Sequence, residues 1–405
     1  MNATVDDGPS LRQRFELLDR FLAQHQALWR PRPFTELQLP WEREHPQLAA
    51  WLRSRSLEDA EAAHNQPALL KAPEPFASLA AQAQVLSQVG SLPLRPPQAM
   101  DARQNAGVPG RKWQQILAFG SALDFLQRPE RWLDWCAGKG HLGRLLAHNG
   151  QPVTCLEWDA QLVADGARIS QRLGLPVSHR QQDVLQPGAT NELAAGAGAV
   201  ALHACGDLHV ELLRQGSAAR CRQLAVAPCC YNRTRSDHYQ PLSTSARQAA
   251  LQLSRDDLGL PLSETVTAGS REKRQRDQSM AWRLAFDLLQ RELRQSDCYL
   301  PTPSLPSAWL KKSLRDYCRD LAALKNLPPP AEQDWPALER RGWQRLAQVR
   351  NLELLRGLFR RPLELWLVLD RALYLEENGY RVRVGTFCDA ELTPRNLLLL
   401  AELDD

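Results

Sequence analysis

The stretch RWLDWCAGKGHLGRLLA, residues 131–147, decides the fold. Its apolar beginning predicts a buried strand that leads to Asp134, and Gly138 and Gly140 predict a tight turn before a helix that starts near His141. Glycines in such a turn let the backbone approach a ligand closely, and the first N–H groups of the helix can bind an anionic or polar group. The segment therefore predicts a ligand site at the end of this strand.

Short apolar runs alternate with helical patterns after this segment. The predicted strands are residues 132–135, 153–158, 177–179, 199–204 and 224–227, and two more, 380–387 and 396–403, follow an amphipathic helix at 362–378. Strands that alternate with helices in this way form a parallel sheet with right-handed crossovers. The sequence therefore predicts an α/β fold with a Rossmann-like sheet.

The rest of the chain is mostly helical and is interrupted by prolines. Residues 1–105 are predicted to form a helical N-terminal region, and residues 106–405 are predicted to form the α/β domain. Within that domain, a helical insertion of residues from about 232 to 361 is predicted after the fifth strand.

The chain has 405 residues, of which 43% are apolar and 24% are charged. These values are close to those of globular proteins and exclude a wholly disordered or fibrous chain. No stretch approaches the roughly 18 uncharged apolar residues that a membrane span needs, and the acidic start lacks a signal-peptide core. We therefore expect a soluble, cytoplasmic protein with no membrane partner, and the sequence leaves its oligomeric state open.

Charge is distributed unevenly along the chain. Residues 271–361 hold 19 Lys and Arg against 11 Asp and Glu, although the net charge of the whole chain is only +4. This distribution favours a polyanionic partner such as RNA or a ribosomal component. The basic run at 271–276 is either a contact for a nucleic-acid backbone or a solvated helix face, and Arg395 either reaches a phosphate or supports a turn.

Acidic residues stand at the ends of the first three predicted strands. The glycines of residues 138–143 match the dinucleotide pattern G-x-G-x-x-G, but Asp134 stands where dinucleotide enzymes usually carry an apolar residue. Glu157 suits two ribose hydroxyls, and Asp183 suits the exocyclic amine of adenine. Three such acids without a second nucleotide-binding half fit S-adenosyl-L-methionine better than NAD. The predicted cofactor-binding residues are Asp134, Cys136, Ala137, Gly138, Gly140, Glu157, Trp158, Asp183, Val184, His203 and Ala204.

Four motifs together resemble a known family. They are CAGKGHLG (136–143), LHACGDLH (202–209), APCCY (227–231) and LTPRNLLLLA (392–401). The set is similar to the methyltransferase-like family whose members carry "rRNA adenine dimethylase domain-containing" names. The ACGDL segment also resembles, more distantly, the tRNA ribose 2′-O-methyltransferases, although YNR at 231–233 replaces their His-rich run. The resemblance covers about residues 110–402 and implies a class I methyltransferase fold that uses S-adenosyl-L-methionine.

The predicted catalytic residues are Asp207, His203, Tyr231 and Lys112. The fourth strand lies beside the first in this topology, which places His203 and Asp207 near the transferable methyl group. His203 has three interpretations: it lines the cofactor, it deprotonates the acceptor, or it bonds to the backbone. Asp207 has two: it faces the substrate, or it caps a helix. Tyr231 stacks on a nucleobase or packs as a lid. Lys112 corresponds to a basic residue of the resembled family, where it closes over cofactor or substrate, or it is simply solvated.

Several cysteines are candidate metal ligands. The nine cysteines include no C-x-x-C pair, so neither a disulfide framework nor a zinc ribbon is predicted. His203, Cys205, Cys229 and Cys230 stand at neighbouring strand ends, but adjacent strand residues point to opposite faces. Cys229 and Cys230 would therefore converge only if the strand had already broken. We predict no metal, and instead small thiols that pack the floor of the cofactor site.

Three functions are compatible with these residues. The first is methylation of ribosomal or transfer RNA, with the basic insertion as one wall of the acceptor cleft. The second is methylation of a protein, such as a ribosomal protein. The third is a non-catalytic scaffold that retains the cofactor site. The methylated atom is not specified, because nitrogen, oxygen and carbon acceptors share this scaffold.

Overall fold

The structure, a computed structural model, describes residues 10–96, 108–186, 192–194, 196–263 and 270–403. The chain divides into two compact units. The sheet unit comprises residues 1–23, 86–262 and 362–405, and the helical unit comprises residues 24–85 and 263–361.

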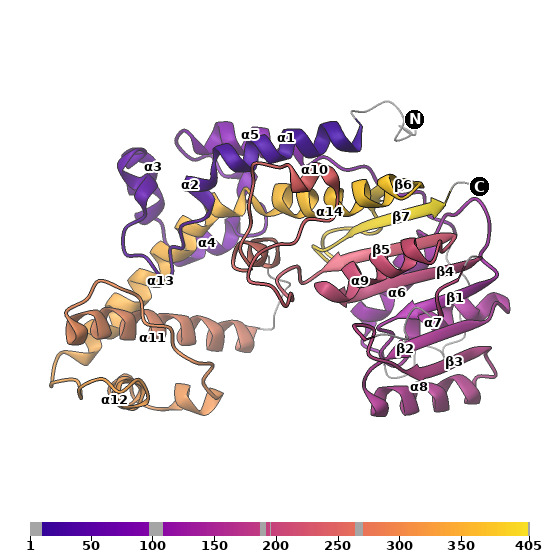
Figure 1. The fold of residues 1–405 in the computed structure, drawn as a ribbon. Helices are drawn as coiled ribbons and strands as arrows, with labels where there is room; N and C mark the ends of the chain where they lie inside the picture. Colours follow the sequence, from indigo (N-terminus) through magenta and orange to yellow (C-terminus); the bar gives the residue numbers. More distant parts are fainter. Residues whose placement is uncertain (1–9, 97–107, 187–191, 195, 264–269, 404–405) are drawn as a thin grey trace. The chain divides into compact units, whose positions relative to one another are not determined.

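A seven-stranded sheet forms the centre of the sheet unit (Figure 1). Its strands are β1 (Arg131–Trp135), β2 (Val153–Glu157), β3 (Val177–Gln181), β4 (Ala197–Cys205), β5 (Gln223–Cys229), β6 (Tyr380–Thr386) and β7 (Leu397–Leu403). The order is β3-β2-β1-β4-β5-β7-β6, and β7 runs antiparallel to both of its neighbours. Each apolar run in the sequence forms one of these strands, so the predicted α/β fold with a Rossmann-like sheet is confirmed.

The strand order reverses between β1 and β4, which pair in parallel. From β1 the chain proceeds outward to β2 and β3, and it then returns to β4 and β5 on the other side. The carboxyl ends of these parallel strands therefore share one edge of the sheet. Open α/β sheets bind ligands at this edge, next to the point of reversal.

Helices pack against the sheet and protect its apolar residues. The helices of the sheet unit are α1 (Leu11–Gln24), α6 (Gly110–Ser121), α7 (His141–Leu146), η4 (Ala147–Asn149), α8 (Ala160–Arg172), α9 (Asp207–Ala218), α10 (Thr244–Arg247), η6 (Asp257–Leu262) and most of α14 (Arg360–Glu377). Phe119 of α6, Trp132 of β1 and Leu145 of α7 belong to one buried cluster. In α9, the Ser217 hydroxyl lies 3.1 Å from the Tyr374 hydroxyl of α14. These contacts fix the helices that border the ligand-binding edge.

The helical unit has its own core. Its helices are α2 (Gln26–Trp29), η2 (Pro40–Arg43), α3 (Pro46–Arg53), α4 (Leu57–Ala63), η3 (Pro67–Leu69), α5 (Phe76–Leu86), α11 (Ser270–Arg294), η7 (Ser307–Lys311), α12 (Leu314–Leu324) and α13 (Trp335–Gly357). Gly342 lets α13 approach α11 closely, because a Cβ there would lie 2.6 Å from the Ala281 carbonyl oxygen. Asn351 of α13 donates hydrogen bonds to the carbonyls of Arg55 and Ser56 at 3.2 and 2.9 Å. Residues from both ends of the chain therefore build this core.

The predicted domain limits remain a prediction. The boundary between residues 105 and 106 lies outside the described residues. The two compact units combine pieces of each predicted domain, since residues 24–85 pack with residues 263–361. Over the described ranges, every helix is too short or too polar to traverse a lipid bilayer.

Candidate functional site

Asp134, at the end of β1, supports the glycine turn from inside the protein. Its side chain is buried, and its Oδ2 accepts a hydrogen bond from the N–H of Gly143 at 2.9 Å. Burial raises the pKa of Asp134 to about 7, although the Gly143 bond and nearby Arg144 favour the charged form. A side chain at Gly143 would not fit, because its Cβ would lie 2.5 Å from the Cys155 Sγ. Asp134 thus fixes the start of α7, and its predicted role in cofactor binding stays a prediction.

The turn itself has a left-handed backbone. Cys136, Gly138 and Gly140 have φ angles of 60°, 58° and 70°. A Cβ at Gly140 would lie 2.5 Å from the Cε1 of His179, whereas no heavy atom lies within 4 Å of a Cβ built at Gly138. Packing therefore requires glycine at position 140. At Gly138 the backbone borders open space, through which a ligand can approach.

Glu157 joins the end of β2 to this turn. Its Oε2 accepts a hydrogen bond from the N–H of Gly138 at 2.9 Å, and its Oε1 accepts from the next two backbone N–H groups at 3.0 and 3.1 Å. The N–H of Ala137 donates to the carbonyl of Leu156 at 2.9 Å. The structure thus brings Glu157, Ala137 and Gly138 together and holds the carboxylate in one orientation.

The next predicted cofactor residues lie on loops after β2 and β3. Trp158 is 72% exposed, and its carbonyl accepts a hydrogen bond from the Gln181 side chain at 3.2 Å. Asp183 is exposed, and its Oδ1 accepts from the N–H of Leu185 at 3.0 Å. Val184 is buried. Trp158 and Asp183 are therefore accessible at the ends of neighbouring strands, and Val184 anchors the second loop.

His203 lies near the end of β4 in a left-handed conformation with φ of 70°. Its Nε2 is 3.0 Å from the Oε1 of Gln115, whose own Nε2 donates to the Leu392 carbonyl at 3.1 Å. The second bond sets the orientation of the amide, so the Nε2 of His203 is the donor and its Nδ1 carries the lone pair. Desolvation, followed by the charges of Lys112 and Arg395, lowers the pKa of His203. The ring is therefore neutral at pH 7.

Gln115 is a site residue that the sequence did not indicate. It lies on α6 one turn after Lys112, and this spacing places both side chains on the same side of the helix. This spacing from Lys112 was the feature of the sequence that could have indicated Gln115. The neighbouring predicted residue Ala204 is fully buried.

Basic side chains lie near the ends of β4 and β5. Lys112 and Arg395 are close enough to His203 to lower its pKa. Hydrogen bonds from the neighbouring thiols lower the pKa of Cys230, and the charges of Arg395 and Arg233 lower it further. We call Lys112, Arg233 and Arg395 the basic rim. The basic rim thus places positive charge near His203 and Cys230, at the ends of β4 and β5.

Asp207 and Tyr231 line a cavity of about 270 Å³ beside α9. Asp207 is the first residue of α9, and its Oδ2 accepts a hydrogen bond from the N–H of Arg235 at 2.8 Å. The Tyr231 ring is 2% exposed, with the Arg371 guanidinium 5.3 Å from its centre and the His209 ring edge-on to it. The geometry favours the structural alternative for both residues: Asp207 holds the loop after β5, and the enclosed Tyr231 ring is not placed to stack on a nucleobase.

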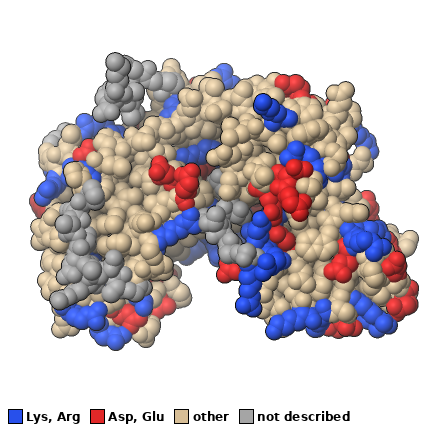
Figure 2. Space-filling model, turned by 180° about the vertical axis from the view of Figure 1, so that it is seen from behind, with Lys and Arg blue, Asp and Glu red and all other residues tan. Residues whose placement is uncertain are grey.

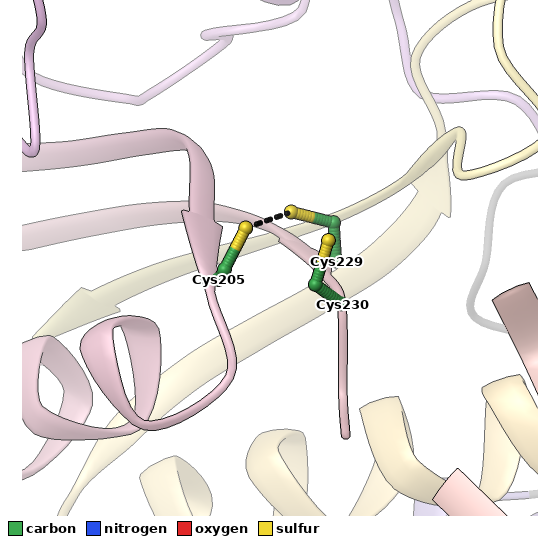
Figure 3. A group of neighbouring side chains, drawn as sticks. All are labelled: Cys205, Cys229 and Cys230. Atoms are coloured by element: carbon green, nitrogen blue, oxygen red, sulfur yellow. Dashed lines mark hydrogen bonds between the residues drawn. The ribbon is translucent and has the colours of Figure 1, made fainter. Parts of the chain in front are cut away.

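The cysteines converge, contrary to the expectation from strand alternation. β5 ends at Cys229, and Cys230 turns into a left-handed conformation with φ of 47°. As a result, the sulfur atoms of Cys205, Cys229 and Cys230 lie within 4.8 Å of one another (Figure 3). Among the described residues, this group contains the three cysteines and not His203.

Comparison with protein families identifies the domain. Residues 111–237 match a family described as a methyltransferase domain. The chain therefore contains a methyltransferase domain. The matched residues include the glycine turn, Glu157 and the ends of β4 and β5. The methyltransferase part of the resemblance is therefore confirmed, and the narrower relationship to "rRNA adenine dimethylase domain-containing" proteins remains a proposal.

Several solved structures are distantly similar to the chain. Magnesium protoporphyrin IX methyltransferase from Synechocystis PCC 6803 with bound SAH is 12% identical, with 76% of this chain and 90% of that chain covered and a TM-score of 0.31. The tRNA (uracil-54, C5)-methyltransferase of Pyrococcus abyssi is 17% identical, with 26% of each chain covered and a TM-score of 0.22. The 16S rRNA methylase RmtB is 18% identical, with 54% of this chain and 84% of that chain covered and a TM-score of 0.21. Similarity at this level carries no argument about the acceptor.

The residues at the strand ends fit the cofactor of this enzyme class. The backbone at Gly138 borders open space, and the Glu157 carboxylate is oriented beside it. An exposed carboxylate, that of Asp183, follows on the next loop. These are the groups that a nucleoside with a free ribose and an adenine amine requires.

Proposed function

We propose that this enzyme methylates RNA, either ribosomal or transfer RNA, in the cytoplasm. The basic rim carries the proposal, because phosphate groups bind to basic side chains and the rim borders the edge where the acceptor meets the methyl donor. The face drawn in Figure 2 mixes positive and negative side chains. The proposal therefore depends on this local group of residues and not on the net charge.

The basic run at 271–276 gives weaker support. Lys273 forms an ion pair with Glu61, and Arg276 lies 3.8 Å from the Asp277 carboxylate. Part of this charge is therefore compensated within the helical unit. Any contribution of residues 271–276 to RNA binding stays a prediction.

Within this proposal, the chain's own residues position the reactants. When bound, S-adenosyl-L-methionine supplies a methyl group on a sulfonium, which the acceptor atom displaces. Glu157 would hold the ribose and Asp183 the adenine amine, while the N–H groups at the start of α7 would face the amino-acid part. Since positioning provides most of the rate in such a displacement, the fixed turn after β1 is the main catalytic element.

His203 is the proposed general base for an acceptor that must lose a proton. Its ring is neutral at pH 7, and the Gln115 bond leaves the lone pair on Nδ1. A general base of this kind contributes about 10²–10⁴-fold to the rate. We therefore expect His203→Asn to lower kcat while the affinity for S-adenosylhomocysteine stays within about threefold of wild type.

A labelling experiment tests the proposal. Purified enzyme and tritiated methyl donor are added to a lysate from cells that lack this chain, and the product is divided between nuclease and protease. Nuclease-sensitive label supports RNA as acceptor, and label that only protease releases supports the protein alternative and overturns the proposal. If S-adenosylhomocysteine binds but neither RNA nor protein is labelled, the proposal of RNA methylation is overturned in favour of the non-catalytic scaffold.

A further inference from the structure

The three cysteines Cys205, Cys229 and Cys230 form a cluster that the methyltransferase assignment does not use. Cys205 is the last residue of β4, and Cys229 is the last residue of β5. The two are paired across the strands, and their sulfur atoms are 3.7 Å apart. Cys230 adds a third sulfur from the residue after the strand, and Figure 3 shows it on the same side as the other two.

The spacing matches what a tetrahedral thiolate site requires. Zinc–sulfur bonds of about 2.3 Å at tetrahedral angles separate neighbouring sulfurs by about 3.8 Å. The Cys205–Cys229 separation is 3.7 Å, and the third sulfur lies within 4.8 Å of both. A small side-chain adjustment of Cys230, which is only partly buried, would complete three bonds to one ion.

The backbone is shaped for this convergence. A strand that continued through Cys230 would direct its side chain away from that of Cys229. Instead, Cys230 adopts a φ of 47°, which is costly for a residue other than glycine. Strained residues of this type cluster at functional sites, and here the strained conformation directs a third sulfur toward the pair.

We propose that Cys205, Cys229 and Cys230 bind one zinc ion. Each protonated thiol loses its proton on coordination, so binding releases protons to solvent and involves no change of oxidation state. Among the described residues, no fourth Cys, His, Asp or Glu joins the group. Three protein ligands with a remaining position are typical of zinc sites that bind water or a substrate atom. The site therefore takes a water molecule or a donor atom of the acceptor as its fourth ligand.

A redox pair is the competing interpretation of the same sulfurs. Cys205 and Cys229 are close enough for a disulfide, but a disulfide uses two thiols and leaves the convergence of Cys230 without a purpose. The number of sulfurs therefore favours a metal. Oxidation is nevertheless a distinguishable outcome of the test, because disulfide formation transfers two electrons to an oxidant such as oxygen, lowers the protein mass by two hydrogen atoms and leaves no metal.

The test measures metal content and cobalt spectra of the full-length chain. Protein purified under reducing conditions is analysed for zinc by mass spectrometry, stripped with a chelator and titrated with cobalt alone. Cys205→Ser and Cys230→Ser remove ligands, while Cys298→Ser removes an exposed cysteine outside the cluster and serves as the matched control. Circular dichroism and S-adenosylhomocysteine binding show whether each variant is folded.

We expect one zinc ion per wild-type chain and per Cys298→Ser chain, with a thiolate-to-cobalt charge-transfer band after exchange. Each ligand variant should bind zinc at least about tenfold more weakly. The proposal is overturned if folded wild-type protein binds neither ion, if the ligand variants bind zinc as tightly as Cys298→Ser, or if a Cys205–Cys229 disulfide forms in place of a metal site. None of these results depends on the identity of the methyl acceptor.

Discussion

Replacing Asp134 by Asn removes one titratable group and keeps the shape of the side chain. An Asn side-chain oxygen can still accept the hydrogen bond from the N–H of Gly143, which Asp134 accepts at 2.9 Å. Burial raises the pKa of Asp134 from 3.8 to about 7 in the folded protein. The protonated acid is therefore favoured in the folded state, and a neutral amide imitates it.

The sign and size of the effect follow from this shift. Between pH 3.8 and about 7, folded Asp134 keeps a proton that the unfolded chain has lost, so its contribution to stability falls as the pH rises. Each pKa unit corresponds to 1.36 kcal/mol, so the full loss is on the order of 4 kcal/mol. We expect Asp134→Asn to gain about 2 kcal/mol of stability relative to wild type between pH 5 and pH 7.

Urea unfolding followed by tryptophan fluorescence measures this difference at pH 5, 6, 7 and 8. Only the difference between variant and wild type is informative, because partly desolvated histidines act in the opposite direction. The pKa of His141, for example, is lowered to about 4, which makes the protein more stable as the pH rises. A difference that is constant from pH 5 to pH 8 would refute the raised pKa of Asp134.

Three further predictions follow from individual contacts. Gly138→Ala should cost about 1 kcal/mol of stability and should also weaken S-adenosylhomocysteine binding at least about tenfold. The control Gly174→Ala, which is also at positive φ with open space around its Cβ, should lower stability without weakening binding. Equal affinities of the two variants would exclude a ligand at Gly138. Gly206→Ala should destabilise the protein by about 3 kcal/mol in urea unfolding, because its Cβ would lie 1.9 Å from the Arg233 carbonyl oxygen. Gly150 is also at positive φ but has open space around its Cβ, so a loss of stability no greater than that of Gly150→Ala would contradict this prediction. Substitution by Ala of any one basic-rim residue (Lys112, Arg233 or Arg395) should reduce the slope of log affinity for RNA against log salt concentration by about one. The control Arg12→Ala, which removes a side chain 68% exposed on α1, should leave this slope unchanged. An equal slope in all four variants would show that the basic rim does not bind RNA.

The sequence was sufficient for the strands and for the turn after β1. Apolar runs of strand length bounded by helical patterns are local signals, and the runs at 153–158 and 224–227 became β2 and β5. The role of the glycines could also be predicted from the sequence, because both a tight turn and the close approach of a ligand to the backbone require a residue without a Cβ. Local chemistry therefore predicted the part of the site that local backbone builds.

Long-range contacts were not predictable in the same way. His203 and Gln115 are 88 positions apart, and their bond depends on how α6 packs beside β4. The convergence of the cysteines depends on a single backbone angle at Cys230, which strand alternation cannot anticipate. Tyr231 was open to two interpretations because the partner that covers it, Arg371, comes from a helix 140 positions later.

Calorimetric titration of the full-length protein with S-adenosylhomocysteine tests the central claim most directly. The turn after β1 and the carboxylate of Glu157 should bind one molecule per chain, and Glu157→Ala should bind it at least about tenfold more weakly. Absence of any heat with S-adenosylhomocysteine, together with clear binding of a nicotinamide dinucleotide, would contradict the account.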